Sequence, residues 1–176
     1  EFIKRNGEFT VNIALIENKT PVLGVIHIPV TNHTYYGSKT NGSYLIKNND
    51  QPNPIKISSS DCNTVRITSS RSHSGKKINL FLEEFNNYKT IIKGSSIKFC
   101  LVASNEADIY PRFGPTSEWD VAAGDAIVRY AGGKTLTLEG QALQYNQKED
   151  FLNPEFIVTN NKIETSQLLD LVKKIS

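Results

Sequence analysis

The feature that most constrains the fold is a change in hydrophobic rhythm along the chain. Residues 9–47 read as successive strands rich in alternating or β-branched apolar residues, and Asn41-Gly42 in this region is the strongest short hairpin signal. After Ile55, strand-like runs alternate with helix-like runs. We therefore expect an antiparallel meander followed by an α/β layer, which places the chain in the α/β class.

The expected elements divide the chain into two parts. The meander should contain strands at residues 9–16, 22–30, 33–39 and 43–47. The α/β layer should contain strands at 65–70, 89–94, 108–113, 134–138 and 156–160, with helices at 76–85, 95–107, 117–130 and a final amphipathic helix that places Leu168, Leu171, Val172 and Ile175 on one face. The polar stretch 48–54 contains two prolines and predicts a boundary. We expect subdomains at 1–54, the remainder of an N-terminal antiparallel sheet, and at 55–176, a C-terminal α/β unit.

Composition narrows the classes of function. The chain has 176 residues, 38% hydrophobic and 22% charged, which suits a globular protein with its own core. A net charge of +2 and basic runs no longer than two residues give no support for binding to nucleic acid or to a membrane surface. No stretch has the ~20 apolar residues of a membrane span. No feature indicates an oligomeric state.

The cysteines bear on the cellular compartment. Cys62 and Cys100 lie far apart without metal-type or redox-type spacing. Two reduced thiols in a cytoplasmic protein are the default expectation, with a single disulfide as the alternative. A peripheral position on the inner membrane is the alternative localisation.

Two features predict that further sequence precedes the chain. It contains no methionine and opens with Glu1-Phe2. The first strand of the meander is also strongly apolar, and a sheet edge of that kind normally has a neighbour. We therefore expect a fragment whose first strand is covered by preceding residues.

Three junctions in the α/β layer gather polar residues. Residues 69–73 follow its first strand and include His73, Gly94-Ser95-Ser96 follows the second with Lys98 close behind, and Arg112 ends the third. In an open α/β layer, ligands bind where strands pass into loops, so we expect the three junctions to face one crevice.

The second and third junctions suit a phosphate group. Gly94-Ser95-Ser96 before a helix offers backbone N–H groups and hydroxyls, while Lys98 and Arg112 add positive charge. The alternatives are a plain helix cap, a surface arginine and, for His73, an ordinary loop histidine. We interpret His27 and His33, in or beside the meander, as structural.

Asp120 has unusual neighbours. It follows the only tryptophan and begins a predicted helix, where the helix dipole favours an anion. The small residues Ala122, Ala123 and Gly124 allow another backbone, a metal ion or a phosphate to approach closely. A carboxylate is a hard ligand suited to Mg²⁺. The remaining acids form no tight set with it, and Asp125 falls on another face of the helix.

These residues resemble a known family. EWDVAAGDAIV is similar to the second signature of the inositol monophosphatase superfamily, in which the aspartate binds magnesium at the start of a helix. GSSIKFCLVA, YPRFGPT, SRSH and FLNPEF look like the 3'(2'),5'-bisphosphate nucleotidase branch of the bacterial CysQ type. The resemblance extends over almost the whole chain.

The resemblance implies part of a layered αβαβα sugar-phosphatase-like fold and a magnesium-dependent phosphatase. Such enzymes remove the 3'-phosphate from 3'-phosphoadenosine 5'-phosphate to give AMP and phosphate, serve sulfur metabolism and are inhibited by lithium. Asp120 would hold the metal beside the nucleotide bisphosphate substrate. Contacts to that substrate would come from Asp120, Lys98, Arg112, Ser95 and His73.

One departure from the family pattern affects activity. The first signature, Asp-Pro-x-Asp-Gly-Thr, supplies further metal ligands and is absent from this sequence. The chain therefore holds no complete catalytic set, and we expect it to be inactive by itself. The alternative functions are a phosphatase for inositol phosphates and a non-catalytic fragment that binds nucleotides or phosphate.

Overall fold

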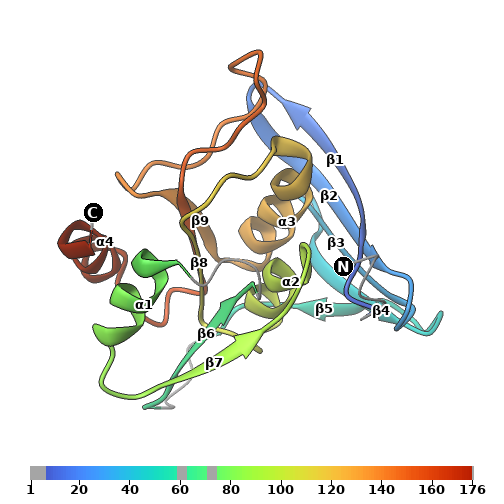
Figure 1. Cartoon of the computed structure of the whole chain (residues 1–176). Coiled ribbons are helices and arrows are strands. Elements are labelled where there is room, and N and C mark those ends of the chain that lie inside the picture. The colour runs from blue at the N-terminus through green and yellow to red at the C-terminus, as the bar shows by residue number, and fades with distance from the viewer. Residues whose placement is uncertain (1–6, 59–62, 71–74, 176) are drawn as a thin grey trace.

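The computed structural model describes residues 7–58, 63–70 and 75–175, which form two sheets and four helices (Figure 1). The α/β class expected from the sequence is confirmed. None of the helices in this part of the chain is long and apolar enough to cross a membrane.

The first sheet is the predicted meander. It contains β1 (Val11–Glu17), β2 (Thr20–Ile28), β3 (His33–Ser38), β4 (Gly42–Lys47) and β5 (Asn53–Ile55), all antiparallel and in chain order. Gly42 has a φ of 79° beside the β3–β4 turn, a conformation that glycine adopts without strain. β5 lies where we expected only a loop, and its pairing with β4 at the sheet edge tolerates Pro54. The division at residue 54 falls within β5 and remains a prediction.

The second sheet and the helices follow in alternation. Their bounds are β6 (Val65–Ser69), α1 (Lys76–Glu83), β7 (Tyr88–Ile92), α2 (Ile97–Ala103), β8 (Ile109–Arg112), α3 (Glu118–Ala131), β9 (Lys134–Thr137), β10 (Phe156–Thr159) and α4 (Thr165–Ile175). The strand order is β7-β6-β8-β10-β9. β6 is parallel to β7 and β8, whereas β10 is antiparallel to β8 and β9, so the sheet is mixed.

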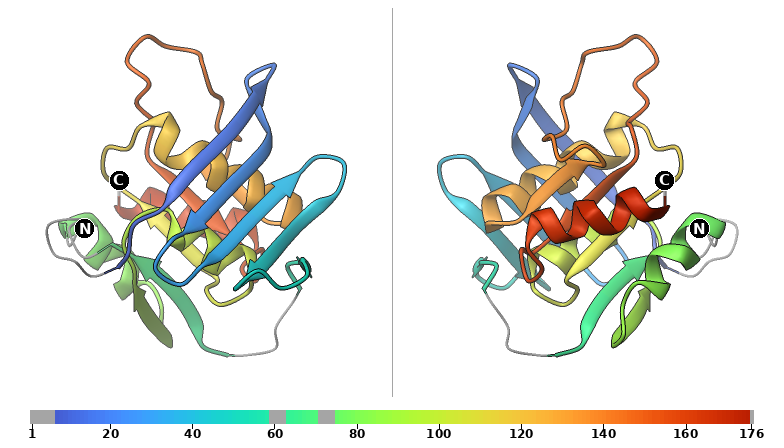
Figure 2. Two further views of the ribbon diagram at one scale, coloured as in Figure 1. Left: turned by 90° about the vertical axis from the view of Figure 1, so that its right-hand side faces the viewer. Right: turned by 90° about the vertical axis from the view of Figure 1, so that its left-hand side faces the viewer.

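Sheets and helices stack in layers. α2 and α3 lie between the two sheets, and α1 and α4 cover the other face of the second sheet (Figures 1 and 2). Alternate residues of the second sheet serve the two cores: Tyr110 and Phe156 pack toward α2, whereas Ile109 and Ile157 pack toward α1 and α4. The described residues thus give the order sheet, helices, sheet, helices.

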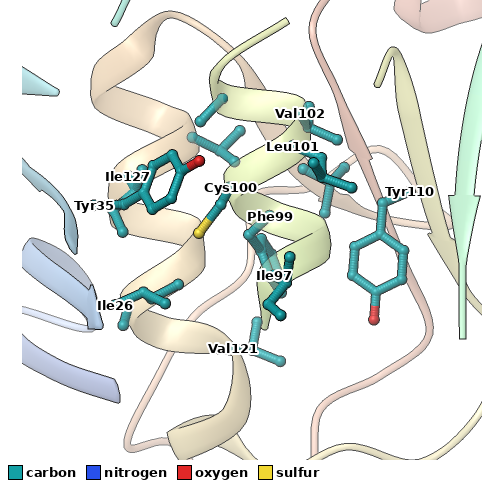
Figure 3. Packing of buried hydrophobic residues seen from close by; sticks show 14 of the residues in the cluster. Ile26, Tyr35, Ile97, Phe99, Cys100, Leu101, Val102, Tyr110, Val121 and Ile127 are labelled. Carbon is teal, nitrogen blue, oxygen red and sulfur yellow. The ribbon is translucent and has the colours of Figure 1, made fainter. Parts of the chain in front are cut away.

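The central core joins both sheets. Figure 3 shows Cys100 and Phe99 of α2 between α3 and the second sheet, with Ile26 and Tyr35 of the first sheet reaching the same cluster. Cys100 is a free, fully buried thiol, and burial raises its pKa. Cys62 lies outside the described residues.

Small residues let α3 lie close to its neighbours. A Cβ atom at Gly24 of β2 would overlap the carbonyl oxygen of Ala123, and a Cβ at Gly124 would overlap the Phe99 ring. The helix therefore touches β2 backbone to backbone, while α2 packs against its glycine. We expected the small residues after Asp120 to allow the close approach of another backbone, a metal ion or a phosphate. The structure shows the backbone of β2 in this position, against Ala123.

β1 presents two different faces. Val11, Ile13 and Leu15 point outward and are more than half exposed. The alternate residues Ala14 and Ile16 pack against the core. An apolar row is thus exposed on the outer face of the first sheet.

A buried ionic cluster ties three strands of the second sheet together. Asp108, directly before β8, is fully buried and accepts hydrogen bonds from the Arg66 guanidinium (2.7 and 3.1 Å), the Arg66 backbone N–H (2.7 Å) and the Asn160 amide (2.9 Å). Burial alone would raise the pKa of Asp108, but these hydrogen bonds and the Arg66 charge outweigh it and hold the pKa below its ordinary value. The cluster joins the amino-terminal ends of β6 and β8 to the carboxyl-terminal end of β10.

Candidate functional site

A polar pocket lies at the opposite end of the β6 and β8 strands, away from the ionic cluster. It encloses about 200 Å³ and is lined by residues that follow β6, β7 and β8, together with the first turn of α3. Because β6, β7 and β8 are parallel, their carboxyl ends meet there. All three predicted junctions contribute, through Ser70, residues 94–96 and Arg112.

Four of the five predicted site residues line this pocket: Ser95, Lys98, Arg112 and Asp120. The fifth, His73, lies outside the described residues. His27 and His33 belong to the meander, where the His27 Nδ1 is 2.9 Å from the Thr34 hydroxyl. Neither of them lines the pocket.

Asp120 caps the amino-terminal end of α3 and also lines the pocket. It is exposed in the first turn of α3, and its Oδ2 accepts a hydrogen bond from the Ser117 N–H at 3.3 Å. The carboxylate keeps further acceptor capacity, which suits a hard cation. Within residues 7–58, 63–70 and 75–175 no three His, Cys, Asp or Glu side chains group as a metal site. The described residues therefore offer magnesium one carboxylate ligand.

Lys98 is built into the pocket wall. Its side chain is almost fully buried, and its ammonium donates to the carbonyl oxygens of Ser95 (2.6 Å) and Lys93 (3.2 Å). It also lies 5.1 Å from the centroid of the Tyr110 ring. Lys98 thus stabilises the 94–96 loop by hydrogen bonds to its backbone, and these bonds hold its positive charge beside the pocket.

Arg112 organises the segment that leads into α3. Its guanidinium donates to the carbonyl oxygens of Gly114 (3.2 Å) and Pro115 (2.7 Å). Neighbouring Tyr110 is buried, which raises its pKa to about 12, so the phenol stays protonated at neutral pH. The pocket therefore combines two fixed cations with one carboxylate.

The 94–96 loop differs from the expectation in one respect. The Gly94 N–H is not available to a phosphate, because it donates to the buried Glu8 carboxylate at 2.9 Å. Lys93 also contacts Glu8, at 3.4 Å. Ser95 has a φ of 52°, in the left-handed region, and its hydroxyl is exposed in the pocket. Of the backbone N–H groups and hydroxyls that we expected this loop to offer, the Gly94 N–H is thus engaged within the protein, whereas Ser95 faces the pocket.

Sequence reasoning missed three residues in β1 or just before it. Glu8 holds Gly94, Thr10 contacts Ser95, and Asn12 itself lines the pocket. A signal for them exists in the sequence: they occupy alternate positions beside a strand, so they share one face. That face is polar next to the pocket and apolar further along β1.

The fold and the pocket together define a layered α/β protein with a polar pocket at the carboxyl ends of parallel strands. The model of the inositol monophosphatase family matches residues 1–176. This chain belongs to the inositol monophosphatase family.

Named relatives make the comparison sharper. The chain is 46% identical over 159 residues to the 3'(2'),5'-bisphosphate nucleotidase CysQ of Salmonella typhimurium, and 43% identical to that of Escherichia coli K12. Each comparison covers 90% of this chain and 63% of the relative. The chain therefore spans less than two thirds of the length of these relatives.

Solved structures agree. CysQ from Bacteroides thetaiotaomicron, a bacterial member of the inositol monophosphatase family, is 40% identical with a TM-score of 0.82, covering 93% of this chain and 66% of that structure. An inositol monophosphatase from Zymomonas mobilis is 22% identical with a TM-score of 0.77, covering 98% of this chain and 65% of the other. The second comparison concerns the fold alone.

Proposed function

We propose that the protein containing this chain is a magnesium-dependent phosphatase that removes the 3'-phosphate from 3'-phosphoadenosine 5'-phosphate, giving AMP and inorganic phosphate. The observation that carries the proposal is the pocket, in which the ends of β7 and β8 bring Ser95, Lys98 and Arg112 to Asp120. The relatives at 43–46% identity, named 3'(2'),5'-bisphosphate nucleotidase, support the choice of substrate.

Three pocket residues have assigned roles in this proposal. Asp120 is one ligand of magnesium, and the bound ion would supply positive charge at the phosphoryl group. Lys98 and Arg112 attract the anionic substrate and hold it in one orientation. Hydrogen bonds to the loop carbonyls already hold these two side chains in place. Little side-chain conformational entropy is therefore lost when the substrate binds.

Further parts of the proposal rest on the family resemblance. They are a nucleotide contact by His73, inhibition by lithium, a role in sulfur metabolism, a cytoplasmic location and the two subdomains 1–54 and 55–176. The 176-residue chain tested by itself is proposed to be inactive, because its described residues give magnesium a single carboxylate.

The experiment measures phosphate release from 3'-phosphoadenosine 5'-phosphate with magnesium, with and without lithium. It uses the full product of the gene and its Asp120→Asn variant. Loss of a metal ligand should exceed the ten- to hundredfold effect of losing a residue that only orients one, so activity should fall by more than about a hundredfold. Asp150→Asn, which removes an exposed carboxylate paired with Lys148, is the matched control.

The outcomes separate the proposal from its alternatives. An Asp120→Asn enzyme as active as the unmodified protein would remove Asp120 from the metal site. A preference for inositol monophosphate in the same assay would assign the protein to the other branch of the family. Turnover by the 176-residue chain itself would show that it holds a complete site.

A further inference from the structure

Residues 141–153, which we call the strap, lie between β9 and β10 and bind the segment that leads into α3 (Figure 1). The paired residues are Glu118 with Phe151, Ser117 with Leu152, and Thr116 with Asn153. The first and the last of these pairs are joined by backbone hydrogen bonds of 2.8 Å. The strap therefore holds three consecutive residues at the start of α3.

The side chain of Glu118 adds a buried contact to these backbone pairs. Glu118 is the first residue of α3 and is buried, and its Oε2 accepts a hydrogen bond from the Asn146 backbone N–H at 2.8 Å. Among the described residues, Asp120 belongs to the lining of the polar pocket and Glu118 does not. Glu118 thus contacts the strap, two residues away from the carboxylate that faces the pocket.

The direction of the Asp120 carboxylate depends on the first turn of the helix. Asp120 is exposed, and the hydrogen bond that holds its carboxylate comes from the Ser117 N–H at 3.3 Å. The first N–H groups of a helix have no partner within the helix, and helix ends fray. Contacts that hold residues 117 and 118 therefore also determine where Asp120 points.

We propose that Glu118 is a positioning residue for magnesium: its hydrogen bond to the strap keeps the first turn of α3 ordered and so holds Asp120 in place to bind the ion. The proposal rests on the part of the proposed function that makes Asp120 a ligand of magnesium. Residues that orient a metal ligand typically change metal affinity by about tenfold to a hundredfold. What Glu118 supplies is an acceptor oxygen that reaches Asn146, and its negative charge is secondary.

Two variants of Glu118 separate reach from charge. Glu118→Gln has nearly the same length and keeps an acceptor oxygen, but it loses the charge. Glu118→Asp keeps the charge, but its side chain is one methylene shorter, so the carboxylate is drawn away from the Asn146 N–H. If Glu118 acted through its charge or bound the ion directly, the aspartate variant would be the better replacement. If it acts through the strap, the glutamine variant is the better one.

The measurement is a calorimetric titration of the substrate-free full gene product with magnesium. Glu118→Asp should bind the ion about tenfold more weakly than the unmodified protein. Glu118→Gln should stay within about threefold, because its neutral oxygen still accepts the bond, though more weakly. At saturating magnesium, KM for the bisphosphate should stay within about twofold in both variants, because Lys98 and Arg112 are unchanged. Urea unfolding shows that the variants are folded.

Tyr145→Phe is the matched control, because it loosens the same strap at another point of the helix. It removes the 3.0 Å hydrogen bond from the Tyr145 phenol to Asp125, which lies beyond the first turn of α3. The bond between Glu118 and Asn146 remains. Tyr145→Phe should therefore bind magnesium within about twofold of the unmodified protein, although it loses a buried hydrogen bond as well.

The outcomes distinguish this inference from the proposed function. The inference is overturned if Glu118→Asp binds magnesium as tightly as the unmodified protein, or if Glu118→Gln binds it more weakly than Glu118→Asp. Equal weakening by Tyr145→Phe would also overturn it, since general loosening of the strap would then be sufficient. Binding of magnesium without release of phosphate from 3'-phosphoadenosine 5'-phosphate would overturn the proposed function alone, because the order of magnesium affinities still decides the role of Glu118. Failure of the unmodified protein to bind magnesium would overturn both.

Discussion

Replacement of Asp108 by asparagine tests whether the buried cluster stabilises the second sheet. Asparagine has nearly the same shape, but it carries no charge and has only one acceptor oxygen for the donors of Arg66 and Asn160. The variant therefore leaves the Arg66 guanidinium without its bidentate partner. Lys162, 3.5 Å from the same carboxylate, loses an ion pair as well.

The size of the effect follows from burial. Removing one partner of a buried ion pair costs about 3–5 kcal/mol. Asp108 is fully buried, but the Arg66 side chain is 27% exposed and can recover some hydration, so we expect about 2–4 kcal/mol. For a protein of this size each kcal/mol shifts the melting temperature by about 2–4 °C. The melting temperature of Asp108→Asn should fall by roughly 5–15 °C.

Differential scanning calorimetry of the full gene product at neutral pH measures this shift. Asp150→Asn is the control, since Asp150 is an exposed carboxylate 3.4 Å from the Lys148 ammonium and should change the melting temperature little. The reasoning is refuted if Asp108→Asn melts no lower than Asp150→Asn. KM for the substrate should stay unchanged, because the cluster and the pocket lie at opposite ends of β6 and β8.

The pH dependence gives a second check on Asp108. Its folded-state pKa lies below the unfolded value of about 3.9, so between these two values the unfolded chain binds more protons and stability rises with pH. The stabilisation is complete above the unfolded pKa and is lost as pH falls through the folded pKa. The difference in melting temperature between the unmodified protein and Asp108→Asn should therefore shrink below about pH 4.

Two further substitutions test packing. Gly124→Ala would press a methyl group into the Phe99 ring and should cost about 1–3 kcal/mol in thermal unfolding, whereas Gly75→Ala has open space and serves as the control. Equal melting temperatures for the two would contradict the close packing of α3. Tyr145→Phe removes the 3.0 Å hydrogen bond from a buried phenol to Asp125 and should cost about 1–3 kcal/mol in urea unfolding. An unchanged urea midpoint would show that this carboxylate needs no donor from Tyr145.

Most elements could be predicted because local signals mark their ends. Asn41-Gly42 marks a hairpin, and Gly132, with a φ of 102°, ends α3 close to the predicted end at residue 130. β5 could not be predicted, because its pairing depends on β4, and Pro52 and Pro54 in and beside it indicate a loop. Tertiary contact here overrides local preference.

The position of the pocket was predictable, but its inner contacts were not. The rule that ligands bind at strand ends brings the three junctions together without any knowledge of side-chain directions. The role of Thr10 depends on which face of β1 turns inward, and alternation defines two faces without saying which one is buried. Hydrophobicity favours the face of Val11, Ile13 and Leu15, yet that face is exposed. The polar face reaches the pocket instead.

The contact between Gly24 and Ala123 determines where the pocket can change. One wall of the pocket is the start of a helix that packs directly on the β2 backbone at Gly24 and has no room for a side chain at Gly124. Other parts of the wall come from the loops after β6 and β7 and from Asn12 of β1, whose contact with Ser96 joins two side chains. Adaptation to a new ligand, in the laboratory or over evolutionary time, should therefore proceed through β1 and the loops, while the helix that carries Asp120 stays constant.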